Sequence, residues 1–385
     1  MKSMNIGLTV TTTVVVLCLG QVAKSSEHSD ANPQVIILKL DDVVAHTSTD
    51  ASPVSPRWQR VTDLAKSRGC VFMTPSEYRA HIETTWAVHE PILRPGPKGS
   101  FSEISVKDPS IVYAHCAWHL FFTARSREEY TTGYVSAPDL SGLQSAPRHE
   151  LNMIRGKTRY GCAPQVFFYA PQGLWYLLFQ NRDANYQPAF STTKTIANPQ
   201  SWSKPLPLMR KDEQAKWIDF WIICDDTKAH LFYTQAHRGV VVRATSLTEF
   251  PHGWGKGQEV LTGVHEAVHI YRVKGHTQFH MIYELNRDGV RSFGLATAAS
   301  LMGPWNKVTD DYATTDQLTC NGQSTVWTDM VSHGEVVRSG YDQHLEYDPE
   351  ACQWIIQGIR REAVKGPYPS LPWKLGIIRK SETQD

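Results

Sequence analysis

Residues 117–124, AWHLFFTA, alternate apolar side chains with polar or aromatic ones, as a half-buried β-strand does. Three similar runs follow at intervals of about 50 residues, which is the size of a small antiparallel sheet. Each run is followed by a second β-prone run that ends in small residues. Several of these units close on a tryptophan. The later runs are LWYLLFQN (174–181), AHLFYTQ (229–235) and TQFHMIYEL (277–285).

A fifth, looser unit fits HLEYDPEACQWIIQGI at residues 344–359, so four or five units fill residues 95–385. A regular repeat of this size is typical of a β-propeller, whose blades are small sheets around a central channel. A β-sandwich also has many short strands, but it does not require regular repeats. We therefore predict an all-β fold, a five-bladed β-propeller over residues 91–385.

The first 25 residues have the pattern of a secretory signal peptide. Lys2 supplies a positive start, an apolar stretch of about a dozen residues follows up to Leu19, and Ala23 begins a small-x-small cleavage site. The apolar stretch is too short for a comfortable membrane span. We expect a secreted, extracellular protein.

Residues 26–90 differ in pattern from the rest of the chain. VIILKLDD (35–42) predicts a buried strand, residues 55–69 a capped helix, and CVFM a second strand. We expect a small α/β appendage to the propeller.

The composition excludes some partners. The formal net charge is +1, which indicates neither a nucleic-acid nor a membrane-surface partner, and we expect a monomer. Six cysteines follow the signal segment without zinc-like spacing, and the sequence does not pair them as disulfides. Tryptophan and tyrosine are prominent, and their ring faces can pack on sugars.

Three acids stand at the start of the apolar run that opens the first, third and fourth units: Asp108, Asp219 and Glu266. Residues at equivalent places in propeller blades converge on the axis at one end of the channel. An inverting glycoside hydrolase needs a base that activates water and an acid that protonates the leaving oxygen. A third acid raises the pKa of the proton donor by charge repulsion. Asp225 and Asp226 follow the strand of Asp219, and we interpret them as turn formers.

Long motifs in this order resemble glycoside hydrolase family 62, secreted α-L-arabinofuranosidases that act on arabinoxylan and share their five-bladed fold with family 43. The resemblance covers residues 95–385. The motifs include KDPSIVY (107–113), CAPQVFFYAPQGLWYLLFQ (162–180), KWIDFWIICDD (216–226), HEAVHIYRVKG (265–275), VSHGEVVRSGYDQ (331–343) and LPWKLGII (371–378).

The resemblance implies roles for individual residues. Asp108 matches the general base, Asp219 the aspartate that tunes the pKa, and Glu266 the general acid. The family holds a calcium ion in its channel, and His333 would be its protein neighbour. The substrate-binding candidates are Lys107, Gln165, Trp221, Glu335, Arg338, Tyr341 and Tyr368.

The chain also departs from the family pattern. Asn181 stands where a tryptophan commonly stacks on the xylan backbone, and Pro369 where an asparagine is frequent. Residues 34–88 resemble the edges of a polysaccharide deacetylase-like domain, but they are too few to form such a barrel.

The substrate is expected to be a polysaccharide, arabinoxylan in the leading interpretation. Arabinan or another furanoside glycan is the alternative for an enzyme. A sugar-binding propeller without activity is the alternative of another class, and the presence of all three acids argues against it.

Overall fold

The computed structural model describes residues 85–381, apart from residues 152–159, 182–187, 210–215 and 321–326. It also describes three strands nearer the N-terminus. The chain divides into two compact units, Met1–Glu83 and Thr84–Asp385. Among the described residues, no helix combines the length and apolar character that a membrane crossing needs.

The first unit contains a three-stranded antiparallel sheet in the order β2-β1-β3. Its strands are β1 (Thr13–Leu19), β2 (Pro33–Lys39) and β3 (Cys70–Met73). β2 and β3 coincide with the two strands expected in the appendage, whereas β1 comes from the expected signal segment. The helix expected at residues 55–69 lies outside the described residues.

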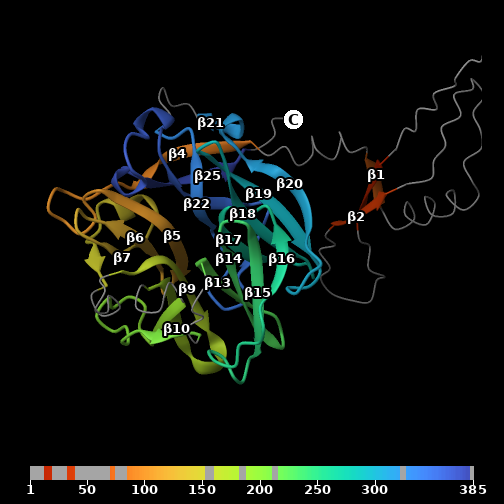
Figure 1. Ribbon diagram of the computed structural model, residues 1–385, viewed down its shortest axis with the longest axis horizontal. Helices are drawn as coiled ribbons and strands as arrows, with labels where there is room; N and C mark the ends of the chain where they lie inside the picture. Colours follow the sequence, from red (N-terminus) through yellow and green to blue (C-terminus); the bar gives the residue numbers. More distant parts are fainter. Residues whose placement is uncertain are drawn as a thin grey trace, which may run out of the picture. The chain divides into compact units, whose positions relative to one another are not determined.

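The second unit is a five-bladed β-propeller, as predicted (Figure 1). The first four blades are sequential. Blade one has β5 (Ser105–Ala114), β6 (Ala117–Arg125), β7 (Tyr130–Ala137) and β8 (His149–Glu150). Blade two has β9 (Cys162–Tyr169), β10 (Leu174–Gln180), β11 (Pro188–Thr193) and β12 (Leu206–Pro207). Blade three has β13 (Trp217–Cys224), β14 (Lys228–Gln235), β15 (Gly239–Ser246) and β16 (Gln258–Thr262). Blade four has β17 (Glu266–Val273), β18 (Phe279–Arg287), β19 (Val290–Ala298) and β20 (Asn306–Ala313).

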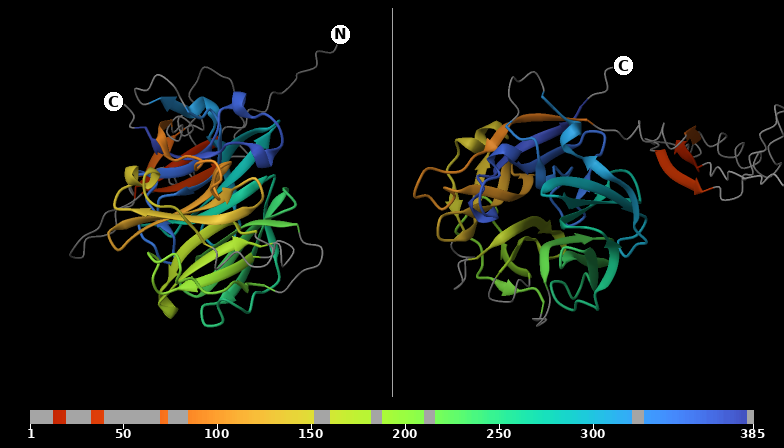
Figure 2. Two further views of the ribbon diagram at one scale, coloured as in Figure 1. Left: turned by 90° about the vertical axis from the view of Figure 1, so that its left-hand side faces the viewer. Right: turned by 45° about the horizontal axis from the view of Figure 1, so that its top comes forward.

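The fifth blade is built from both ends of the unit. Its order is β21-β4-β25-β24-β22, and the N-terminal β4 (Trp86–Leu93) lies antiparallel beside the C-terminal β25 (Lys374–Lys380). Figure 2 shows this pairing closing the ring of blades. The remaining strands are β21 (Leu318–Cys320), β22 (Val331–Val336) and β24 (Gln353–Gly358), while the short β23 (Glu346–Tyr347) pairs with β17. The pairing of β4 with β25 places both strands inside the sheet, where neither is an edge strand.

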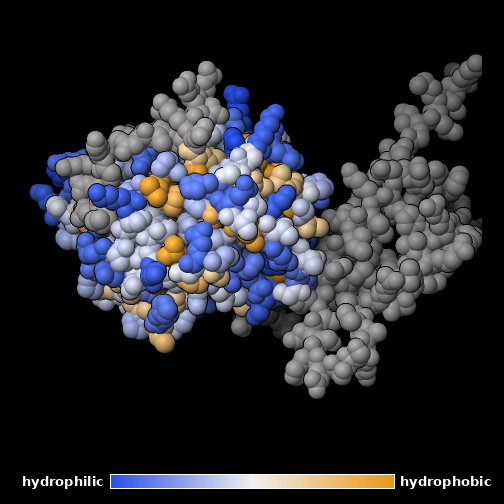
Figure 3. Space-filling view, turned by 90° about the horizontal axis from the view of Figure 1, so that it is seen from below, coloured by the Kyte–Doolittle hydropathy of each residue, from blue (hydrophilic) through white to orange (hydrophobic). Residues whose placement is uncertain are grey.

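Two of the tryptophans that close the repeat units, Trp202 and Trp305, join neighbouring blades. Trp202 ends the second unit and meets Phe121 of blade one edge-to-face, at 5.6 Å between ring centroids. Trp305 ends the fourth unit and meets Phe232 of blade three in the same way, at 6.2 Å. Both tryptophans are buried. These contacts explain why the sequence repeat ends on a large aromatic residue. On the described part of the face in Figure 3, apolar residues are scattered among polar ones.

Every inner strand of the propeller carries a β-bulge near its start. The pairing registers shift after Lys107, Cys162, Ile218, Glu266 and Ser332. In the first four blades the next residue has a positive φ, between 47° and 55°. Bulges re-aim side chains and are frequent beside active sites. In blades one, two and three, two successive residues at the bulge face the same cavity at one end of the channel.

Candidate active site

A cavity of about 450 Å³ opens where the inner strands begin, and all three predicted acids line it. Asp108 and Asp219 lie within the bulges of blades one and three. Glu266 is the last paired residue before the bulge of blade four. The lining also contains Lys107, Tyr130, Tyr160, Cys162, Ala163, Gln180, Ile218, His237, His265, Asn286, Arg291, His333 and Tyr368.

The sequence interpretation was wrong in one detail of register. Glu266 is the last residue before its bulge, so its counterparts are Lys107 and Ile218. Ala267 is the counterpart of Asp108 and Asp219, and it shares their left-handed backbone. Since consecutive strand residues point to different sides, this offset brings Glu266 into the cavity from another direction than the two aspartates.

Asp108 is held in a charged and buried environment. Its carboxylate lies 3.7 Å from the ammonium group of Lys107 and 3.5 Å from Nδ1 of His333. Burial alone would raise the pKa of Asp108, but these neighbours outweigh it and the pKa lies below the ordinary value. The backbone N–H of Asp108 donates to Gln357 at 3.0 Å. Asp108 is therefore ionised at neutral pH, as a base that accepts a proton from water must be.

Asp219 experiences the opposite effect. Its carboxylate accepts hydrogen bonds from the Gln180 side chain at 3.0 Å and from the Ala267 backbone at 2.8 Å. Burial raises the pKa of Asp219 well above the ordinary value, and the charges of Glu266 and Asp108 raise it further. Because electrostatic coupling is mutual, Asp219 in turn favours the protonated form of Glu266.

Glu266 has an arginine partner that the sequence analysis did not include. Arg291, on β19, donates to Glu266 at 2.6 Å. Burial would raise the pKa of Glu266, but Arg291 and then His265 outweigh it, and the pKa lies below the ordinary value. A proton donor has to be protonated before it acts, so this pairing opposes the acid form and Asp219 supports it.

Arg291 is shared with a fourth acid, Glu284 of β18, which is fully buried. Glu284 accepts hydrogen bonds from the Ser332 hydroxyl and the His333 backbone N–H, both at 2.7 Å. Burial raises the pKa of Glu284 to about 7. Glu284 thus joins blade four to blade five directly behind the cavity.

Three residues predicted to bind substrate or metal also line the cavity: Lys107, Tyr368 and His333. The ammonium group of Lys107 lies 4.7 Å from the ring centroid of Tyr368, a cation–π distance. Nδ1 of His333 lies between the two aspartates, 3.8 Å from Asp219. The structure thus places all three side chains at the cavity, and their roles stay predictions.

The other substrate-binding predictions do not reach this cavity. Gln165 bonds the backbone of Ile222 in the next blade, with both contacts at 2.7 Å. Trp221 is buried and donates to the carbonyl of Ile270 at 2.8 Å. Both side chains hydrogen-bond to the adjacent inner strand. These bonds between blades explain why a polar and an amphipathic residue occur at these two positions.

Glu335, Arg338 and Tyr341 lie further along the channel. Glu335 and Arg338 form a buried ion pair at 2.6 Å, and Arg338 also donates to the carbonyls of Ile111 and Val166. Tyr341 is 39% exposed and lines a second cavity of about 580 Å³ together with Tyr113 and Trp118. Tyr113 stands five residues beyond Asp108 on the same strand, so this cavity lies towards the other end of the channel.

The turn prediction for the two remaining acids holds for Asp225. Its carboxylate accepts the backbone N–H groups of Thr227 and Lys228, each at 2.8 Å, between β13 and β14. It also contacts His230 at 2.7 Å. Asp226 is exposed and lies 3.5 Å from Arg272. Neither acid lines the active cavity.

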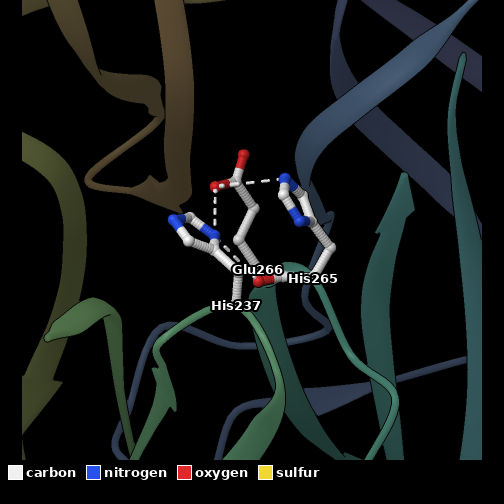
Figure 4. Close-up of side chains that lie close together, drawn as sticks. All are labelled: His237, His265 and Glu266. Atoms are coloured by element: carbon white, nitrogen blue, oxygen red, sulfur yellow. Dashed lines mark hydrogen bonds and ion pairs between the residues drawn. The ribbon is translucent and has the colours of Figure 1, made fainter. Parts of the chain in front are cut away.

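His237 and His265 were also missed by the sequence interpretation. His237 comes from the turn between β14 and β15, and His265 immediately precedes Glu266. Their nitrogens lie 3.4 and 3.8 Å from Oε2 of Glu266 (Figure 4). The only signal available for His265 was its position beside a predicted catalytic acid.

The protein offers few ligands for the expected calcium ion. Calcium takes six to eight oxygen ligands, and among the described residues no group of three histidines, cysteines or acids with converging ligand atoms surrounds His333. Within the described part of the chain, the acids beside His333 would therefore supply only part of a calcium shell, and backbone carbonyls, amides or water would have to complete it.

A five-bladed propeller with three carboxylates gathered at one end of its channel offers the pair of acids that glycoside hydrolases use. The family model described as glycosyl hydrolase family 62 matches residues 98–379. The chain belongs to this family.

Individual relatives agree with this assignment. Alpha-L-arabinofuranosidase C from Cellvibrio japonicus (strain Ueda107) is 33% identical over 307 residues. The match covers 76% of this chain and 46% of that protein, so the chain spans about half the length of this relative.

Two solved structures are similar over most of the chain. The catalytic domain of a family 62 alpha-L-arabinofuranosidase from Coprinopsis cinerea has a TM-score of 0.72 and 32% identity, and covers 78% of this chain and 98% of its own. A family 62 hydrolase in complex with xylotriose has a TM-score of 0.70 and 29% identity, with coverages of 77% and 97%.

Proposed function

We propose that the protein is a secreted, inverting α-L-arabinofuranosidase that removes terminal arabinofuranosyl side chains from arabinoxylan. The observation that carries the proposal is the meeting of Asp108, Asp219 and Glu266, from three blades, in one cavity. Family membership and the similar hydrolase with bound xylotriose support a xylan-type substrate.

The chemistry follows from the charges at the three acids. Asp108 takes a proton from a water molecule, whose oxygen attacks the anomeric carbon of arabinose. The bond to the leaving oxygen breaks, and Glu266 donates its proton to that oxygen. Asp219 raises the proton affinity of Glu266 and holds the backbone beside it through the Ala267 N–H. The product sugar has the inverted configuration.

The test is release of arabinose from wheat arabinoxylan and from arabinan by the wild type and by Glu266→Gln. We expect release from arabinoxylan, with a loss of several orders of magnitude in the variant. Release from arabinan alone would replace the xylan assignment. Absence of release from every arabinosylated glycan by folded wild-type protein would leave the sugar-binding alternative.

Two further expectations belong to the same proposal. A calcium ion beside His333, with water as its main ligand, should raise the thermal midpoint when added and lower it when chelated. No change with either treatment would contradict the calcium site.

Secretion predicts that the exported protein begins near residue 26, which N-terminal sequencing measures. An exported protein that keeps Met1 would contradict the signal peptide.

A further inference from the structure

We propose that His237, His265 and Glu266 form a binding site for one divalent transition-metal ion of the zinc type, and that the bound ion inhibits the enzyme. The inhibitory part rests on the proposed role of Glu266 as the proton donor. The ligand atoms of the three residues all lie within 4.8 Å of one another, and Figure 4 shows the three side chains gathered at one point.

The distances are close to those of a metal site. Zinc binds nitrogen and oxygen at about 2.0–2.2 Å, so two ligands of a tetrahedral ion lie about 3.3 Å apart. Here Nδ1 of His237 and Nε2 of His265 lie 3.4 and 3.8 Å from Oε2 of Glu266. Movements of a few tenths of an ångström bring each nitrogen to this spacing from Oε2, a turn of one ring brings the two nitrogens together, and a water molecule completes the set.

The two imidazole rings are able to make this adjustment. They are stacked with centroids 4.7 Å apart and planes 24° apart, so one ring has to turn for both lone pairs to meet the ion. The His237 side chain is 51% exposed and has room to turn. Its weak contact to the His265 carbonyl, at 3.2 Å, would be exchanged for the metal bond.

Arg291 occupies only one oxygen of Glu266. It donates to Oε1, whereas Oε2 faces the two histidines. Arg291 also pairs with Glu284, so its positive charge is divided between two carboxylates. A carboxylate that is hydrogen-bonded through one oxygen and coordinates through the other is a common arrangement in metal sites.

The donor set selects the type of ion. Two imidazole nitrogens and one carboxylate oxygen suit zinc, copper or nickel, whereas calcium and magnesium prefer oxygen ligands. The bound ion would hold Glu266 as a carboxylate and keep a proton from its oxygen. Glu266 could then not protonate the leaving oxygen, and turnover would stop.

The first experiment measures binding without reference to activity, by titrating Zn²⁺ into the full-length protein in a calorimeter. We expect one ion per chain. His237→Asn and His265→Asn should each weaken binding by about tenfold or more, while His252→Asn, at an exposed histidine away from the cavity, should leave it unchanged. Wild-type affinity in both His237→Asn and His265→Asn would overturn the site.

The second experiment measures arabinose release with and without Zn²⁺. We expect inhibition at the concentrations at which Zn²⁺ binds, recovery with EDTA, and no inhibition by Ca²⁺ or Mg²⁺. The two histidine variants should need at least tenfold more Zn²⁺ for the same fractional inhibition. Binding that depends on both histidines but leaves turnover unchanged would support the metal site and contradict the role of Glu266 as proton donor.

Discussion

Arg291 donates to the carboxylate of Glu266 at 2.6 Å, and this contact opposes the acid form of the residue that has to supply a proton. Asp219 acts in the other direction, because Glu266 raises the pKa of Asp219 and this coupling between the two carboxylates is mutual. The protonation of Glu266 therefore depends on the balance between one arginine and one aspartate. The upper pH limit of the reaction should move when either residue is changed.

Removal of Arg291 should extend activity to higher pH. In Arg291→Gln the pKa of Glu266 loses its main lowering influence and rises, so the basic limb of the pH–rate profile should move upward by about one pH unit. Arg291→Lys keeps the charge and should shift the limb less. Thermal unfolding checks that each variant is folded, since Glu284 loses a buried partner. An unchanged basic limb in folded Arg291→Gln would contradict the pairing.

Asp219→Asn should move the basic limb in the opposite direction. Loss of the negative charge lowers the pKa of Glu266, and activity should be lost at a lower pH than in the wild type. The pKa of Asp219 itself is raised by burial and by its acidic neighbours, so as an anion it destabilises the folded protein at neutral pH. The thermal midpoint at pH 7 should be equal or higher in the variant. A large drop in midpoint would show that Asp219 is mainly structural.

Glu335 should make the protein less stable as the pH rises. Burial raises the pKa of Glu335 from 4.5 to about 7, so the folded state holds a proton that the unfolded state has released. The associated stabilisation is complete below pH 4.5 and is lost as the pH rises through 7, by about 3 kcal/mol. Urea unfolding between pH 5 and 8 should show a shallower decline in Glu335→Gln. The exposed control Glu259→Gln should follow the wild type, and the same slope in all three proteins would contradict the assignment.

The turn that carries His237 stores backbone strain that a glycine should relieve. Ala236 and His237 both have φ of 54°, a conformation that costs a non-glycine residue about 1–2 kcal/mol. Ala236→Gly should raise the free energy of unfolding by about 1 kcal/mol. Ala244→Gly, within β15, is the matched control and should lower it by a similar amount. Chemical denaturation measures both. Destabilisation of equal size in the two variants would show that the turn is not strained.

The propeller was predictable because its repeat is carried by local patterns. Each period-2 run, such as residues 117–124, became the second strand of a blade, and each predicted acid stands near the start of an inner strand. The helix expected at residues 55–69 lies outside the described residues, so it stays a prediction.

The sequence did not reveal which polar residues of the inner strands face the cavity. A β-bulge adds one residue to each strand, so the offset of Glu266 relative to Asp219 could not be counted from the pattern. Gln165 and Arg338 have the residue types of substrate ligands, but both donate hydrogen bonds to backbone carbonyls of other blades. Arg291 comes from the third strand of its blade, where no motif indicated a role.

The pairing of β4 with β25 has a consequence for folding during synthesis. The blade that completes the ring needs Trp86–Leu93, which precedes the other four blades in the chain, and Lys374–Lys380, which follows them. The ring therefore cannot close on the ribosome until Lys374–Lys380 has emerged. Until then the edge of β4 that pairs with β25 stays exposed to water or to chaperones. A stop codon a few residues before Lys374 should thus abolish a catalytic cavity whose three acids were all synthesised more than a hundred residues earlier.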